Sequence, residues 1–107
     1  MSIRKYIFNL TNQMREGTAS VDARTKLAYA RAYMQGEEGL NRYRDRAIAS
    51  KIAKVYNQDA QLAILFNKDT HPDEYGEYQM FRAECKSAVD AEMAALKAEL
   101  ENALKEV

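Results

Sequence analysis

The segment THPDEYGEYQMFRAECKSAVDAEMAALKAELENALKEV, residues 70–107, carries the strongest secondary-structure signal in the chain. Pro72 stands near its beginning and is followed by two acidic residues, an arrangement typical of the first turn of a helix. After Pro72 there is no further proline, and the only glycine is Gly76. Ala, Glu, Lys and Leu dominate the rest, and all four are strong helix formers. The segment therefore predicts one long helix that runs to Glu106.

The apolar residues of this segment form one stripe at helical spacing. They are Tyr75, Tyr78, Phe81, Cys85, Val89, Met93, Leu96, Leu100, Ala103 and Val107. From Val89 onward the steps alternate between four and three, as they do in a coiled coil. About 35 helical residues give a rod of about 50 Å, whereas a compact domain of this size has a diameter of roughly 33 Å. We therefore expect part of the stripe to lack a cover within the chain.

A seam near the end of the segment is the candidate protein-binding surface. It consists of Val89, Met93, Leu96, Leu100, Leu104 and Val107. A second copy of the chain or a foreign protein would cover it, in the way that amphipathic helices pair with a partner. Fraying of the last turns and a plain helical end are alternatives that the sequence leaves open.

The rest of the chain predicts three short helices and a brief fourth. In the first three, apolar residues recur at helical spacing over 3–14, 23–34 and 40–56. Gly17 and Gly36 follow the first two of these segments, as helix-ending glycines do.

The helix starts and the fourth helix depend on fewer residues. Ser20 is the expected N-cap of the second helix and Asp59 that of the fourth. The fourth helix holds Leu62, Leu65 and Phe66. Its apolar run could form a buried strand on composition alone, but no second strand exists to pair with it, so we predict helix. The expected fold is all-α: a small bundle of short N-terminal helices packed on one long C-terminal helix.

Composition limits the class of protein. With 107 residues the chain is long enough for one domain, 1–107, with its own core. One cysteine, Cys85, cannot form an internal disulfide. No apolar run approaches the ~18 residues of a membrane span, and the first residues lack the features of a signal peptide. We expect a cytoplasmic protein.

Charge is distributed unevenly along the sequence. Residues 1–56 hold eleven basic and five acidic side chains, and residues 57–107 hold five basic and eleven acidic ones. The basic half contains Arg42, Arg44 and Arg46 close to several tyrosines, which could contact a nucleic acid by pairing and stacking. The sequence pI of about 6.6 is low for such a module. The simpler interpretation is that the basic half and the acidic half neutralise each other within the fold.

The residues that usually carry catalysis are sparse. Cys85 belongs to the apolar stripe, where a buried cysteine acts as a small hydrophobic residue. His71 precedes Pro72 in an expected loop and has no partner implied by the sequence. The carboxylates do not form a metal-ligand pattern with a histidine. We therefore predict no catalytic residue, no metal, no cofactor, no small-molecule substrate and no enzymatic activity.

A resemblance to a known group covers residues 52–95. It is carried by the stretch YNQDAQLAIL at 56–65, by Asn67-Lys68-Asp69 and His71-Pro72-Asp73-Glu74-Tyr75, and by Tyr78-Gln79 and Phe81-Arg82-Ala83-Glu84-Cys85-Lys86. This pattern is similar to small helical proteins encoded in tailed-phage and prophage genomes of gut bacteria. The resemblance implies an accessory phage protein located in the host cytoplasm or in the virion, and it implies no active site.

Together these observations favour a protein–protein interaction module without catalysis, with a structural or assembly role in a phage. Two other functions remain open at this point. One is an inhibitor of a host defence directed at nucleic acid, in which the acidic surface imitates a nucleic acid. The other is direct nucleic-acid binding through the three arginines of the basic half.

Overall fold

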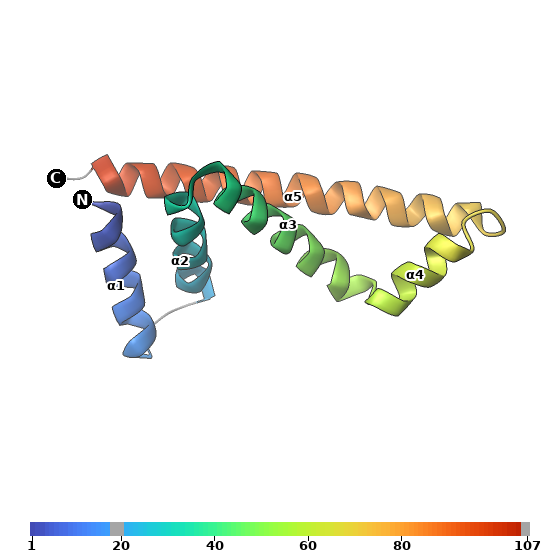
Figure 1. Ribbon diagram of the computed structural model, residues 1–107, viewed down its shortest axis with the longest axis horizontal. Helices are drawn as coiled ribbons and strands as arrows, with labels where there is room; N and C mark the ends of the chain where they lie inside the picture. Colours follow the sequence, from blue (N-terminus) through green and yellow to red (C-terminus); the bar gives the residue numbers. More distant parts are fainter. Residues whose placement is uncertain (18–20, 106–107) are drawn as a thin grey trace. The chain divides into compact units, whose positions relative to one another are not determined.

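The computed structural model describes residues 1–17 and 21–105, and this part of the chain is all-α (Figure 1). The helices are α1 (Ile3–Arg15), α2 (Val21–Met34), α3 (Gly36–Val55), α4 (Gln58–Phe66) and α5 (Pro72–Lys105). No strand occurs among the described residues. The expected fold class, an all-α bundle with a long C-terminal helix, is confirmed, as is the helical state of the apolar run in α4.

Local capping explains where these helices begin and end. The Ser2 side chain accepts a hydrogen bond from the Lys5 backbone N–H (3.2 Å) at the start of α1. The cap of α4 is Asn57, whose side-chain oxygen accepts from the Ala60 N–H at 2.8 Å. The expectation of Asp59 as this cap was wrong by two residues, because the extended backbone that capping needs occurs at Asn57. Ser20, the expected cap of α2, lies outside the described residues.

Two glycines make the junction between α2 and α3 possible. Gly36 has a φ of +76°, a left-handed conformation in which a side chain is strained. Gly39 lies so close to the end of α2 that a Cβ at this position would collide with the Ala32 carbonyl oxygen and the Gln35 Cβ. The junction therefore requires glycine at both positions, for two different reasons.

The chain forms two compact units, and the first comprises Met1–Arg44 together with Glu92–Val107. Within it α1 packs against α2, and the end of α5 completes the core. The centre of the core is formed by Tyr29, Ala30 and Leu100, all buried. Tyr29 meets Tyr43 edge to face, with ring centroids 5.6 Å apart, which is a favoured arrangement for aromatic pairs.

The second unit comprises Asp45–Ala91. It contains the last part of α3, all of α4 and the first part of α5, and its buried apolar residues are Ile48, Ile52, Ile64, Tyr78, Cys85 and Val89. Tyr56 follows α3 and contacts two rings of α5, with centroids 5.2 Å from Tyr78 and 5.5 Å from Phe81. The burial of Cys85 agrees with its place on the expected stripe. Helices α3 and α5 each contribute residues to both units. That residues 1–107 fold as one domain stays a prediction.

Two residues on the expected apolar stripes of α2 and α3 are exposed. Met34 and Val55 both face solvent. Each is the last residue of its helix, α2 and α3 respectively, where the neighbouring helices no longer cover the apolar face. The helical period places a residue on a face but does not show how far along the helix that face is covered.

Candidate functional site

The expected protein-binding seam on α5 is covered by the chain itself. Leu100 is 1% exposed, and Met93, Leu96 and Leu104 pack against the cluster that it forms with Tyr29 and Ala30. Val89 is buried as well, and Val107 lies outside the described residues. The premise that this seam lacks a cover was therefore wrong.

The cover comes from the N-terminal helices. Ile3, Tyr6 and Ile7 of α1 pack against the same cluster as the end of α5. The Lys26 Nζ of α2 lies 2.7 Å from a carboxylate oxygen of Glu99 on α5. The sequence did not predict this cover, because the diameter of one compact domain does not apply to a chain with two compact units, in which the end of α5 belongs with α1, α2 and the first part of α3.

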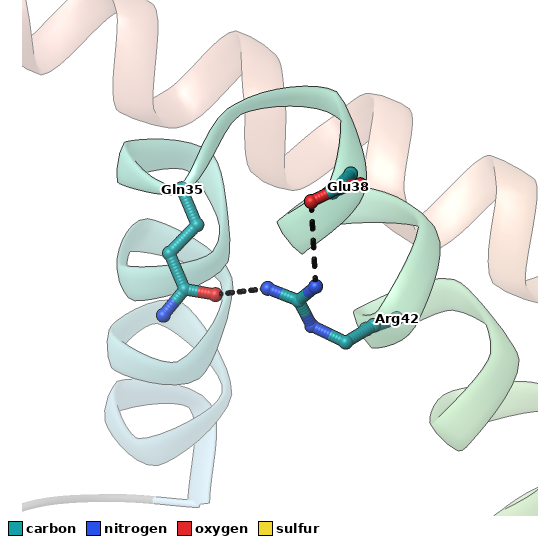
Figure 2. Close-up of polar contacts among 3 residues, drawn as sticks. All are labelled: Gln35, Glu38 and Arg42. Carbon is teal, nitrogen blue, oxygen red and sulfur yellow. Dashed lines mark hydrogen bonds and ion pairs between the residues drawn. The ribbon is translucent and has the colours of Figure 1, made fainter.

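The three arginines proposed as nucleic-acid contacts differ in exposure and in their contacts within the chain. Arg42 donates a hydrogen bond to the Gln35 side-chain oxygen at 2.7 Å and lies 4.0 Å from a Glu38 carboxylate oxygen, as Figure 2 shows. Arg44 is half-buried. Arg46 is exposed and belongs to the other unit. The guanidinium of Arg42 is thus already engaged at the α2–α3 junction.

The charge asymmetry between the two halves of the sequence is much smaller between the two compact units. The unit containing both chain ends holds ten basic and eight acidic side chains, and the unit of residues 45–91 holds six basic and eight acidic ones. Two assignments contribute equally: the acidic end of α5 belongs to the same unit as the basic helices α1 and α2, and the basic last part of α3 belongs to the other unit. This arrangement supports the interpretation that the two halves neutralise each other.

The hydroxyl of Tyr6 lies in the same electrostatic environment as the Lys26–Glu99 pair. Burial, and secondly the Glu99 carboxylate, raise the pKa of Tyr6 above its usual 10.0. The hydrogen bond with Glu99 raises the pKa of Lys26. Burial is also the main cause of the raised pKa of Tyr29 and Tyr43. These groups keep their ordinary charge at neutral pH, and the Lys26–Glu99 pair links α2 to α5.

Helix α4 is fixed to α5 by a specific polar contact. The Tyr78 hydroxyl donates to the Gln61 side-chain oxygen at 2.6 Å, and the Gln61 amide donates to the Tyr56 carbonyl oxygen at 2.9 Å. Ile64, on the same side of α4 as Gln61, is 5% exposed. The guanidinium of Arg82 lies 5.7 Å from the centre of the Tyr78 ring, within the range of a cation–π contact. One face of α4 is therefore held by hydrogen bonds and by packing.

The opposite face of α4 is apolar and exposed. Leu62, Leu65 and Phe66 are 51%, 42% and 89% exposed. They stand at i, i+3 and i+4, so they share one side of the helix. We call these three residues the α4 face. All three were expected on this helix, and the side chain of α4 that the chain buries is Ile64.

The sequence contains a signal for this exposed apolar face. From Leu62 to Phe66 every residue is apolar, so apolar side chains lie on both sides of this short helix. A short helix that packs along one side leaves its other side uncovered. The excess of apolar residues on α4 predicts that some of them are exposed. It does not predict which side of the helix faces solvent.

Metal binding, membrane insertion and known relatives give no further lead. The described residues contain no group of three side chains that could hold a metal ion. None of the helices in the described part of the chain combines the length and the apolar character needed to cross a bilayer. A comparison with protein families, with curated proteins and with solved structures finds no match to this chain.

Proposed function

We propose that this chain is a protein-binding module without catalysis and that the α4 face is its binding surface. The observation that carries the proposal is the 89% exposure of Phe66, beside two half-exposed leucines, on a helix whose other side is already packed. A helix that is apolar all round is normally buried. Helix α4 therefore has one more apolar face than the chain covers.

The energetics favour a partner at this position. Complete burial of a phenylalanine or leucine side chain is worth about 1.5–3 kcal/mol relative to exposure. Exposed apolar patches on soluble proteins frequently mark interaction sites. Aromatic side chains at the centre of an interface, surrounded by smaller contacts, often contribute most of its binding energy. Phe66, flanked by Leu62 and Leu65, fits that description.

The α4 face is also held in a fixed orientation. The hydrogen bond between Tyr78 and Gln61 and the burial of Ile64 tie α4 to its unit before any partner binds. A surface ordered in advance loses less conformational entropy on association. This supports a role as a recognition element rather than as a loose connection.

The resemblance to small phage-encoded helical proteins suggests the biological setting. Residues 52–95, which carry that resemblance, include all of α4. We therefore propose an accessory role in phage structure or assembly, in the host cytoplasm or the virion. Nucleic-acid binding and nucleic-acid mimicry have less support, because Arg42 is engaged within the chain and neither unit has a large excess of one charge.

Site-specific photo-crosslinking in the cells that produce the protein tests this proposal. A photoreactive phenylalanine analogue at position 66 should form defined protein adducts, because its ring lies in the interface. The matched control places the same analogue at Lys86, an exposed position of α5 in the same unit. The absence of adducts at position 66, or equal adducts at both positions, would contradict the proposal.

A further inference from the structure

The exposed side of α1 is basic around one aromatic ring. Phe8 is 61% exposed. Arg4 and Lys5 stand four and three residues before it and Arg15 seven residues after it, so all four lie on one side of the helix. The buried Leu10 lies on the opposite side, and α1 contains no acidic residue. We call Arg4, Lys5, Phe8 and Arg15 the basic face.

The first part of α5 has an exposed side of the opposite sign. Met80 is 68% exposed. Asp73 and Glu77 stand seven and three residues before it and Glu84 four residues after it, so these four also share one side of their helix. The buried Tyr78 lies on the opposite side. We call Asp73, Glu77, Met80 and Glu84 the acidic face.

The charges of these two faces are not neutralised within the described part of the chain. All of these basic and acidic side chains are exposed, and none forms an ion pair with another described residue. Each face therefore has one large apolar side chain surrounded by unpaired charges of a single sign. Surfaces of opposite sign attract each other and select each other's orientation.

The spacing of the two faces matches when the helices run in opposite directions. In an antiparallel pair with Phe8 opposite Met80, the residue four before Phe8 lies opposite the residue four after Met80. This register brings Arg4 and the neighbouring Lys5 against Glu84.

The other end of the same register also joins opposite charges. Arg15 lies seven residues after Phe8 and meets Asp73, which lies seven residues before Met80. Glu77 faces the uncharged Thr11. A parallel pair would bring only Lys5 opposite an acid, Glu77, so the charges favour the antiparallel pair.

We infer that the basic face of one copy of this chain binds the acidic face of a second copy, with α1 antiparallel to the first part of α5. The inference goes beyond the proposed function, because it involves no residue of the α4 face. Every copy carries one face of each sign, so the contact is repeated reciprocally in a closed dimer or continued from copy to copy.

The size of the contact predicts weak association. Arg4 and Arg15 are about 16 Å apart along the helix axis, and one apolar pair falls short of the roughly 800 Å² per partner of a standard stable interface. We expect a dissociation constant of the order of 100 µM at low ionic strength. Added salt should weaken the association, because it screens exposed charges.

Sedimentation of the full chain at low ionic strength tests the inference. From about 5 µM to about 1 mM, a range that brackets the expected constant, the average mass should rise above the 12.2 kDa of one chain. Reversal of the basic face by Arg4→Glu/Lys5→Glu/Arg15→Glu should weaken association at least about tenfold, because like charges then face each other at both ends of the contact.

The matched control reverses three exposed arginines outside the basic face. Arg24→Glu/Arg31→Glu/Arg46→Glu changes the net charge by the same amount and should associate much more strongly than the reversed basic face. Circular dichroism shows that each variant is folded. Equal weakening by the two triple variants would overturn the inference, because net charge alone would then explain the loss.

A compensating variant tests the pairing itself. Reversal of the acidic face by Asp73→Lys/Glu77→Lys/Glu84→Lys should also weaken association. A chain with both faces reversed has the net charge of the parent and should associate like it, since the complementarity is kept. A parent chain that stays monomeric at about 1 mM, well above the expected constant, or a doubly reversed chain as weak as the single reversals, would overturn the inference.

Two truncations separate this contact from the α4 face. Phe8→Ala should weaken association by roughly three- to tenfold, because the apolar pair with Met80 is lost. Phe66→Ala should leave association unchanged. Association that depends on Phe66 and not on Phe8 would overturn this inference while leaving the α4 face as a binding surface. Crosslinking at position 66 tests the α4 face independently of either result.

Discussion

The absence of a side chain at Gly39 allows α3 to approach the end of α2 closely. Its Cα lies against the end of α2, where the Ala32 carbonyl oxygen leaves no room for a Cβ. In most helices replacing glycine by alanine is favourable, since glycine loses more backbone entropy on folding. At Gly39 the close approach opposes that gain.

We predict opposite effects for two glycine-to-alanine substitutions. Gly39→Ala should lower the free energy of unfolding by about 1–3 kcal/mol, because the new methyl group forces the α2–α3 junction apart. Gly76→Ala should raise it by up to about 1 kcal/mol, because Gly76 lies in α5 with open space around it. Urea unfolding monitored by circular dichroism measures both. Equal effects of the two substitutions would contradict the close approach at Gly39.

Single residues were predictable from sequence where local pattern fixes them. Cys85 is buried, as its place on the apolar stripe indicated, and Gly36 ends α2 in a left-handed conformation. Asn57 replaced Asp59 as the cap, because a stretch of three polar residues offers several capping side chains and only the backbone selects among them. The role of Gly39 had no local signal, since it depends on a neighbouring helix.

Helix α5 illustrates what a stripe of apolar residues does and does not establish. The period correctly placed Tyr78, Cys85 and Leu100 on one face, and all three are buried. The same period could not show whether a second chain or the N-terminal helices cover that face. In the structure, α1 and α2 cover its end.

The burial of Leu100 leads to a prediction for this helix. Leu100→Ala should lower the free energy of unfolding by about 2–5 kcal/mol, the usual cost of a large cavity in a core. Leu100→Glu should unfold the unit rather than yield a folded monomer, because an unpaired charge would enter the core.

Asn102→Glu is the matched control, since Asn102 is exposed two residues further along α5. It should leave stability within about 0.5 kcal/mol of the parent. Thermal unfolding followed by circular dichroism checks the three variants. A folded, stable Leu100→Glu protein would restore the view that this part of α5 is an intermolecular seam.

The sequence predicted that α4 is a helix, but it did not predict which face of α4 is buried. No strand partner existed for its apolar run, so helix was the remaining choice. The burial of Ile64 rather than Phe66 depends on the contact between Gln61 and Tyr78, residues 17 positions apart in the sequence. A run with apolar residues on both sides contains no period that selects one of them.

On the scale of the whole molecule, charge is balanced by the fold rather than by sequence order. The acidic end of α5 returns to the basic N-terminal helices, and the Lys26–Glu99 pair is one visible contact between them. The N-terminal amino group of Met1 also donates a hydrogen bond to the Leu104 carbonyl oxygen at 3.4 Å. Four side chains of this unit have a raised pKa because of how the unit packs: Tyr6, Lys26, Tyr29 and Tyr43.

These pKa shifts predict that the chain loses stability at alkaline pH. In the folded state burial raises the pKa of Tyr6, Tyr29 and Tyr43 above 10.0, and the bond to Glu99 raises that of Lys26 above 10.5. All four groups bind their protons more tightly when folded, so their contribution is complete below about pH 10. As pH rises further the unfolded chain loses its protons first, and the free energy of unfolding falls until the folded groups ionise too.

Urea unfolding midpoints, measured at intervals from about pH 8 to about pH 11.5, should be insensitive to these groups up to about pH 9.5 and should decrease above it. Tyrosinate absorbance in the same samples should rise together with the loss of helical signal, because packing within the unit disfavours ionisation of these tyrosines until the unit opens. Tyr29→Phe removes one of the four groups while keeping the ring that meets Tyr43, so its decrease should be shallower. A midpoint that stays constant to about pH 11.5, or tyrosinate formation well before unfolding, would contradict a stabilising role for these tyrosines in the unit that contains both chain ends.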